Sequence, residues 1–342
     1  MTAAGPPRAA TEVRGYLVGG EPVAFRAAGE EHRYLRRFYP EAGAGQPAAV
    51  LVSAGRAGGP GGCAIVDDGR RAVPVPYPGR SPVDALRLVA RSRWLGRLPP
   101  GHLVVHGVAL EVAGTTVLVA GRAHSGKTTL LLDALIAHGA QVRAYDSLLI
   151  DLDRGTGRHV PSIMNVRYLT LSSVAGAAAL LASHELGLDG SAAAERYYAP
   201  GAFRVPSSFA IPAERAVLVV SRGFAAGARA RLARLSPAGA AAGLGGVLEA
   251  WGGWTDIERV ARLLGVAGPS ARELSLRLAR RLATGGGYAF SHHGCPAALL
   301  AAAAGEIATP CRHRWDTGWT PSLAPSPGDG MSRDPVTPRL AT

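Results

Sequence analysis

One stretch, Thr115 to Asp146, constrains the fold of this chain more than any other. Within it, the residues from Gly121 to Thr128 read GRAHSGKT and fit the phosphate-binding loop pattern G-x-x-x-x-G-K-[ST] without a mismatch. An apolar run, Val117 to Ala120, enters the loop, and a helical pattern, Thr128 to Ala137, leaves it and ends at Gly139. The motif therefore lies in the strand–loop–helix context that it requires.

The spacing of this loop predicts a site for a nucleotide polyphosphate. Gly121 and Gly126 let backbone N–H groups curl round phosphate oxygens, and the N-terminus of the following helix adds partial positive charge. Lys127 can reach the β- and γ-phosphates, and the Thr128 hydroxyl can ligate Mg²⁺. We therefore expect a bound nucleotide with Mg²⁺. The nucleotide-binding residues that we expect are Gly121, Arg122, Ala123, His124, Ser125, Gly126, Lys127, Thr128 and Thr129.

Lys127 is the only lysine of the chain, although Lys and Arg together number 37. All the other residues in this count are arginines, and the one lysine stands where a phosphate-binding loop requires it. The alternative is a glycine-rich turn between a strand and a helix that binds no ligand. Nucleotide binding is the working interpretation.

Length and composition indicate a globular chain of one or two domains, since 342 residues with 47% hydrophobic content can bury a sizeable core. The formal charge of +12 raises nucleic-acid binding as a hypothesis, but the arginines are scattered, aromatic residues make up 6%, and no nucleic-acid motif is present. A basic surface would still favour the approach of an acidic peptide or a phosphate-bearing ligand.

The three cysteines, Cys63, Cys295 and Cys311, are too few and too far apart for a disulfide framework, which fits a reducing compartment. The first residues lack the apolar segment of a signal peptide, and no run reaches the ~18 apolar residues that span a bilayer. We expect a cytoplasmic protein without a membrane partner, and homo-oligomers are left open.

The patterning along the chain predicts four regions. Residues 11–98 form a β-rich α+β region, in which strands are expected at Tyr16–Val18, Val23–Phe25 and Ala48–Val52 and a helix from Pro82 to Leu95. The core with the phosphate-binding loop covers residues 99–235. A helical region covers residues 236–312, and a Pro/Ser/Gly-rich tail at 313–342 is expected to be disordered.

Within the core region, two strands, Leu103–Val112 and Thr115–Ala120, are expected to form a hairpin through the turn Ala113-Gly114. The helix after the loop is apolar on nearly every side, so we expect it to be buried. Further strands are expected at Gln141–Ala144, Leu148–Leu152, Val166–Leu171 and Ala216–Val220.

The helical region carries several helix-start signals. Ser236-Pro237 is one, Thr255–Glu258 and Ser270–Glu273 are capping boxes, and Pro296 begins an Ala-rich helical pattern.

The segment from His106 to Leu152, HGVALEVAGTTVLVAGRAHSGKTTLLLDALIAHGAQVRAYDSLLIDL, resembles the catalytic segment of HPr kinase/phosphorylase and its relatives. The points of match are His106-Gly107, the loop itself, Gly139 and Asp146. The run VPSIMNVRYLTL at 160–171 is also similar to HPr-kinase-related proteins of unassigned substrate.

This resemblance implies an α/β fold with a mixed sheet, related to phosphoenolpyruvate carboxykinase, and transfer of the ATP γ-phosphoryl group to a Ser or Thr hydroxyl of a protein or peptide. Relatives that act on ribosomally made precursor peptides, including lasso peptides, make a precursor peptide a reasonable acceptor. The resemblance also implies catalytic roles for His106, Lys127 and Asp146, and Mg²⁺ ligation by Thr128 and Asp146.

The sequence departs from the family pattern at one position. Relatives end the strand after the loop with two adjacent carboxylates, one for the acceptor hydroxyl and one for Mg²⁺, whereas this chain has Tyr145-Asp146. His106, Asp151 or Asp153 are the candidates for the missing function; the plain alternatives are a core histidine and a solvated turn.

Three other functions stay open. Tyr145 favours a catalytically impaired nucleotide-binding regulatory or scaffold protein, a small-molecule hydroxyl is an alternative acceptor, and nucleic-acid binding is the weakest reading. The run Arg222–Arg234 suits a solvated face better than a phosphate or carboxylate site. A zinc site is disfavoured, because the paired ligand types are spaced too tightly; they are His292, His293, Cys295, Cys311 and His313.

Overall fold

The computed structural model describes residues 11–43, 46, 48, 50–56, 62–67, 72–77, 82–188, 195–223, 231–252, 254–266, 270–284 and 288–293. These residues belong to one compact unit, Met1–Pro310. The expected helix from Pro296, the expected tail at 313–342, and Cys295, Cys311 and His313 lie outside the described residues. No helix in the described ranges is both long enough and apolar enough to traverse a bilayer.

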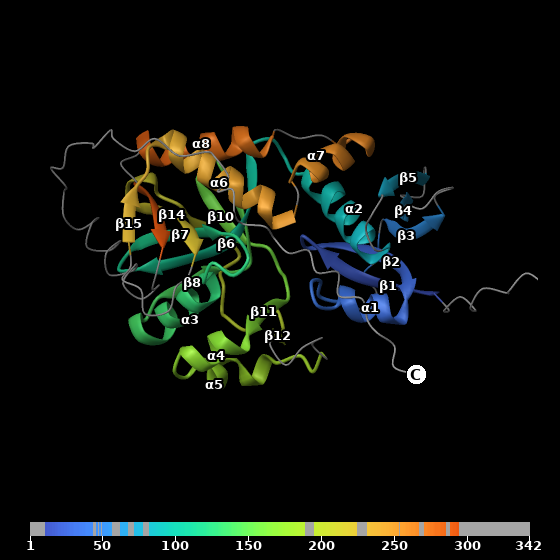
Figure 1. The fold of residues 1–342 in the computed structure, drawn as a ribbon, viewed down its shortest axis with the longest axis horizontal. Helices are drawn as coiled ribbons and strands as arrows, with labels where there is room; N and C mark the ends of the chain where they lie inside the picture. Colours follow the sequence, from blue (N-terminus) through green and yellow to red (C-terminus); the bar gives the residue numbers. More distant parts are fainter. Residues whose placement is uncertain are drawn as a thin grey trace, which may run out of the picture. The chain divides into compact units, whose positions relative to one another are not determined.

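The fold is of the mixed α/β class, and a large mixed sheet carries the phosphate-binding motif (Figure 1). β14 is parallel to both β7 and β16, and the other neighbouring strands are antiparallel. In spatial order the strands are β13 (Phe209–Ala210), β10 (Thr156–His159), β9 (Ser147–Asp151), β6 (His102–Val112), β7 (Thr115–Gly121), β14 (Ala216–Gly223), β16 (Tyr288–His293) and β15 (Arg231–Arg234), with β8 (Gln141–Ala144) also beside β6.

Helices cover both faces of this sheet, and successive residues of β7 pack against helices on opposite faces. Every residue of β7 is buried. Val117 and Val119 belong to one buried cluster together with the leucines of α3 (Lys127–His138). Leu118 and Ala120 belong to another together with residues of α6 (Pro237–Gly252) and α8 (Ala271–Thr284). A strand that is apolar on both faces thus places the loop at the edge of a three-layer core, with α3 and the α6/α8 pair on opposite faces (Figure 1).

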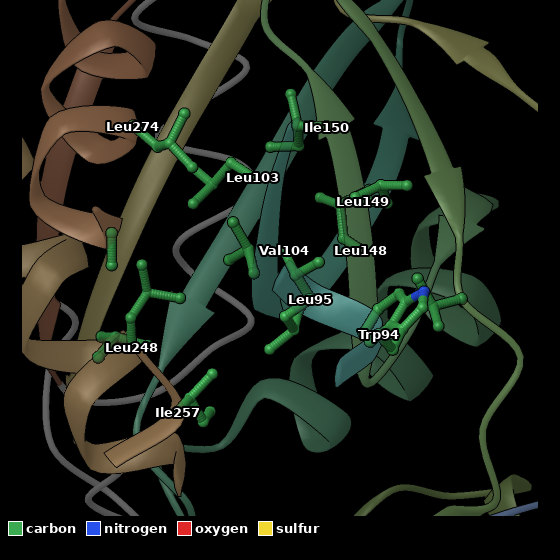
Figure 2. Close-up of a cluster of buried hydrophobic side chains, with 14 of the residues drawn as sticks. Trp94, Leu95, Leu103, Val104, Leu148, Leu149, Ile150, Leu248, Ile257 and Leu274 are labelled. Carbon is green, nitrogen blue, oxygen red and sulfur yellow. The ribbon is translucent and has the colours of Figure 1, made fainter. Parts of the chain in front are cut away.

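The N-terminal region forms a second sheet, in the order β1-β2-β3-β4-β5, onto which α2 (Pro82–Gly96) packs. The same helix contacts α7 (Trp254–Leu263), and Figure 2 shows Trp94 and Leu95 of α2 close to Val104 of β6 and to Leu148. The remaining elements are β1 (Thr11–Val18), β2 (Glu21–Ala28), α1 (Gly29–Leu35), β3 (Leu51–Arg56), β4 (Gly62–Asp67), β5 (Ala72–Tyr77), β11 (Met164–Arg167), α4 (Tyr168–Ser173), α5 (Ala177–Leu181), β12 (Glu195–Tyr198) and two short 3₁₀ helices (Ala182–His184 and Ala213–Arg215).

Most expected elements of the core are confirmed. The hairpin turns at Ala113-Gly114, where both residues have positive φ angles of 48° and 77°, as a two-residue turn between twisted strands requires. The helix after the loop ends at Gly139, whose φ of 61° marks a left-handed cap.

Several expectations are wrong in detail. Residues 168–171 are helical, because β11 ends at Arg167 and α4 begins at Tyr168. Residues 29–35 form α1, a helix that the sequence analysis did not expect within the β-rich region. The C-terminal region is not wholly helical, since β16 inserts between β14 and β15.

The two capping boxes also differ in outcome. Ser270 caps α8, since its Oγ accepts the Glu273 N–H at 3.2 Å. Helix α7 begins at Trp254, so Thr255 lies inside its first turn and is not the N-cap. Its partner Glu258 accepts the Ala271 N–H at 3.1 Å and so stabilises the start of α8 instead.

Candidate functional site

The phosphate-binding loop lies between β7 and α3 and is fixed to the neighbouring strand. Gly126, with φ of 84°, turns the chain into the helix through a conformation that favours glycine. Ser221, on β14, donates a hydrogen bond from its Oγ to the Ser125 carbonyl at 2.9 Å. A side chain at Gly121 would collide with the Ser125 hydroxyl. These contacts fix the loop in a tight turn between β7 and α3.

Lys127 is held by the loop itself. Its ammonium donates to the carbonyl oxygens of Gly121 at 2.9 Å and Arg122 at 2.8 Å. Only 8% of the residue is exposed. Burial lowers the pKa of Lys127 to about 8, and the nearby Asp146 carboxylate opposes this shift. A phosphate group at the loop would supply the negative charge that this buried cation lacks.

Asp146 marks a break between two strands that both pair with β6. β8 pairs along Ala109–Glu111 and β9 along His102–His106. Between them Asp146 adopts a left-handed φ of 58°, which aspartate tolerates better than most residues. Its carbonyl accepts the Gly107 N–H at 3.0 Å, and its carboxylate accepts a long bond from the Ser147 Oγ, at 3.4 Å. The side chain is 36% exposed, so the carboxylate is open to a ligand.

His106 supports this turn as a neutral ring. Its Nδ1 lies 2.8 Å from the Asp146 carbonyl oxygen, which can only accept, so Nδ1 carries the proton. The same nitrogen is 3.6 Å from the Asp146 carboxylate. Burial, followed by the charge of Lys127, lowers the pKa of His106 to about 4. At neutral pH the ring adds no charge and leaves its lone pair on Nε2.

Arg91 joins this group from α2, which precedes the loop by some thirty residues. Burial lowers its pKa to about 10, and the field of Asp146 works in the opposite direction. The charge of Arg91 also disfavours protonation of His106. Lys127, His106 and Asp146, the three residues that the resemblance singles out, thus share one electrostatic neighbourhood with an arginine that the sequence did not indicate.

Tyr145 points away from this group into the core. It is 1% exposed, its ring centroid lies 4.2 Å from that of His159 and 5.3 Å from that of Phe203, and its hydroxyl accepts the Gly201 N–H at 3.2 Å. Tyr145 thus packs in the buried cluster beside α3, whereas the Asp146 side chain is 36% exposed, so the two side chains lie in different surroundings. In this chain the residue before Asp146 is structural.

This placement predicts the outcome of restoring the second carboxylate. Tyr145→Asp is expected to lower the free energy of unfolding by at least about 4 kcal/mol, since it opens a cavity and buries a charge. Tyr145→Phe, which loses only the bond to the Gly201 N–H, should cost about 1 kcal/mol. Urea unfolding of both variants measures this difference. A Tyr145→Asp variant as stable as the wild type would show that the side chain reaches solvent.

A second arginine flanks the loop. Arg167 of β11 donates to His124 Nε2 at 2.9 Å and lies 3.8 Å from the Glu195 carboxylate. Burial, then the charge of Arg167, lowers the pKa of His124. Farther along, the Thr129 and Thr170 hydroxyls are 3.2 Å apart and join α3 to α4. No motif in the sequence indicated Arg167; only the fold brings it beside the loop.

Asp151 and Asp153 do not join the site. Asp151 Oδ1 accepts the N–H groups of Asp153 at 3.0 Å and Arg154 at 2.9 Å, which closes a turn at the opposite end of β9. Asp153 pairs with Arg277 at 2.6 Å. The turn interpretation of this pair is therefore confirmed for Asp151, and Asp153 makes an ion pair remote from the loop.

The residues beside the loop fit Mg²⁺ better than a metal held by protein alone. Within the described ranges, no three His, Cys, Asp or Glu side chains are grouped as a metal site. Mg²⁺ commonly takes one or two carboxylates, with phosphate oxygens and waters completing its shell. The weakly bonded Asp146 carboxylate and the Thr128 hydroxyl, both hard oxygen donors, suit that arrangement. His292 and His293 lie on β16.

Comparison with models of known protein families finds no match to this chain, and comparison with curated proteins finds none either.

Proposed function

We propose that this protein is an ATP- and Mg²⁺-dependent phosphotransferase that moves the γ-phosphoryl group to an acceptor hydroxyl, with a Ser or Thr of a protein or peptide as the leading acceptor class. We also propose that its sheet follows the HPr-kinase-like arrangement of the phosphoenolpyruvate-carboxykinase type. The observation that carries the proposal is the convergence of Lys127, His106 and the Asp146 carboxylate beside one glycine-rich loop.

Each residue has a distinct role in this proposal. Lys127 and the loop N–H groups bind the β- and γ-phosphates, and Thr128 and Asp146 hold Mg²⁺. When bound, Mg²⁺ would neutralise charge on the phosphate oxygens. His106 is a positioning residue, because its Nδ1–H fixes the Asp146 carbonyl at 2.8 Å and so sets the direction of the carboxylate.

The transfer itself demands little covalent chemistry from the protein. The acceptor oxygen forms a bond to the γ-phosphorus as the bond to the leaving ADP oxygen breaks, and the hydroxyl proton is lost late to solvent or to a phosphoryl oxygen. Positioning and charge neutralisation supply most of the rate. One carboxylate is therefore sufficient for a working, if slower, kinase.

The second candidate is a cytoplasmic protein that binds ATP without transferring phosphate and acts as a regulator or scaffold. The core position of Tyr145 favours it, since this chain has one carboxylate where the resembling kinases have two.

Labelling with γ-³²P-ATP distinguishes the two. The protein is incubated with Mg²⁺, labelled ATP and an extract of its source organism, and the products are separated into protein, peptide and small-molecule pools. We expect label in one pool with the wild type and none above background with Lys127→Met. ATP binding by the wild type with no labelled pool would overturn the kinase proposal in favour of the nucleotide-binding regulator.

A further inference from the structure

A cavity of about 100 Å³ opens directly beside Asp146, between α2 and the start of β9. Its polar lining includes Arg87 and Arg91 of α2, Asp146 and Ser147 at the start of β9, and the hydroxyl residues Tyr39 and Ser162. Apolar groups, including Trp94 and Val160, line the rest. A concave, mainly apolar site with a few convergent polar groups is the usual form of a small-ligand site.

Packing and hydrogen bonds hold the first of these arginines, Arg87, in place. The Arg87 guanidinium carbon lies 3.3 Å from the centre of the Phe38 ring, and Nη1 bonds to the Tyr34 hydroxyl at 3.3 Å and to Asp84 at 3.4 Å. Arg91 follows one turn later on the same face of α2. A planar guanidinium held in this way is suited to binding a carboxylate through two parallel hydrogen bonds.

Both arginines already interact with carboxylates of the chain. Asp84 accepts a hydrogen bond from Arg87, and the field of Asp146 acts on Arg91. Both arginines also line the cavity. Because a cation in a site of low dielectric favours an anionic partner strongly, the cavity suits a ligand that carries a carboxylate.

We propose that this cavity is the acceptor subsite, and that Arg91, assisted by Arg87, binds a carboxylate that the acceptor carries close to its reacting hydroxyl. This inference rests on the proposed function and names its substrate class, a hydroxyl acceptor with a neighbouring carboxylate. Trp94 and Val160 would pack against the carbon skeleton, and the hydroxyl would face Asp146.

The volume limits what can enter. Each water requires roughly 10–15 Å³ of such volume, so about 100 Å³ admits a fragment of a few heavy atoms and not a folded surface. The acceptor presents either a free hydroxy acid or one hydroxyl residue of an acidic peptide. Both share the same chemistry, and the experiment separates them.

Titration calorimetry with two matched pairs of probes tests the proposal. One pair is D-glycerate and its neutral amide, glyceramide; the other is acetyl-Glu-Ser-Glu-amide and acetyl-Gln-Ser-Gln-amide. The full chain is used in low salt, with a non-hydrolysable ATP analogue and Mg²⁺. We expect one acidic probe to bind at least about tenfold more tightly than its neutral partner. Preference within the first pair indicates a small hydroxy acid, and preference within the second indicates a peptide.

Variants assign the preference to the cavity. Arg91→Met should abolish it, and Arg91→Lys should retain part of it, because the charge remains without the bidentate geometry. Arg277→Met is the matched control, since it removes one positive charge at the remote pair with Asp153 and should leave the preference unchanged. If Arg91→Met does not fold, Arg87→Met should reduce the preference, and the acid–amide comparison in the wild type stands without variants.

The outcomes separate this inference from the proposed function. Three results would each overturn the acceptor subsite. They are equal affinity for acid and amide, no detectable binding of any probe at millimolar concentration, and a loss of nucleotide binding in place of probe binding in Arg91→Met. Arg91-dependent binding of an acid without any transfer of label from ATP would support the subsite and overturn the kinase.

Discussion

Replacing Asp146 with asparagine is expected to lower kcat by about two to four orders of magnitude while leaving the fold intact. Asparagine keeps the shape of the side chain and tolerates the left-handed φ of 58° that this position has. The main-chain carbonyl that accepts from His106 and Gly107 is unchanged. The substitution therefore removes one negative charge from the site and little else.

The Mg²⁺ dependence of the activity shows whether the Asp146 carboxylate binds the metal. The Mg²⁺ concentration that gives half-maximal activity should rise at least about tenfold in Asp146→Asn, because a neutral amide is a poorer ligand for Mg²⁺ than a carboxylate. Binding of ATP without Mg²⁺ should be unchanged or slightly tighter. The matched control is Asp153→Asn, which removes a carboxylate at the far end of β9 that pairs with Arg277. Wild-type turnover in Asp146→Asn, or an equal loss in Asp153→Asn, would contradict the metal assignment.

The local sequence predicted the parts of the site that are formed by neighbouring residues of the chain. The strand, the loop and α3 follow one another along the chain, and their signals are an apolar run, two glycines and a glycine cap. Asp146 was predicted from the family resemblance, which matches it just after the strand that follows the loop, and it lies between β8 and β9. Gly126 and Gly139 have the left-handed φ angles that such positions require.

The sequence could not indicate residues that reach the site through tertiary packing. Arg91 lies on a helix of the N-terminal region, and its approach to Asp146 depends on how α2 packs between the N-terminal sheet, α7 and β6. Arg167 depends on the end of β11, a strand that the pattern had extended by four residues. In a chain with 36 other basic residues besides Lys127, nothing in either local context distinguishes these two arginines.

The secondary structure was misjudged where two periodicities compete. Tyr168-Leu169-Thr170-Leu171 alternates as a strand does, yet these residues form α4, in which Tyr168 and Leu169 are 58% and 76% exposed. A strand there would need a partner to satisfy its N–H groups, whereas a helix satisfies them itself. For Tyr145 the difficulty was different. The resemblance drew attention to a missing carboxylate, whereas packing explains the tyrosine that is present.

Lys127→Met is expected to abolish ATP binding and, at the same time, to stabilise the protein without nucleotide. The loss should reach about 10³-fold or more in kcat/KM, because the variant lacks the charge that meets the β- and γ-phosphates. The gain in stability follows from the burial of the Lys127 charge. A lysine whose pKa falls from 10.5 to about 8 on folding is held in its charged form at a cost of about 3 kcal/mol at pH 7. The bonds to Gly121 and Arg122 offset part of this cost, so we expect methionine to raise the free energy of unfolding by about 1–3 kcal/mol.

The pH dependence identifies the source of that difference. Below about pH 8 the lysine is protonated in both states, and the penalty is present in full. Between about pH 8 and the unfolded-state pKa of 10.5, the unfolded chain binds the proton and the folded chain does not, so the stability of the wild type rises relative to the variant. Above the unfolded-state pKa the proton-linked difference is gone. Tyrosines titrate in the same range, but they are common to both proteins and cancel in the comparison.

Urea unfolding of wild type and Lys127→Met from pH 7 to pH 11, without nucleotide, measures this gap directly. A gap that favours the variant at pH 7 and closes as the pH rises would show that the loop keeps a buried cation in place for a ligand at the expense of stability. A variant that is less stable than the wild type at pH 7 would mean that the two loop carbonyls stabilise the ammonium more than burial penalises it. In that case the main role of Lys127 would be to hold the loop in its folded shape. The loss of ATP binding in the variant would then result from a collapsed loop and not from a missing contact to phosphate.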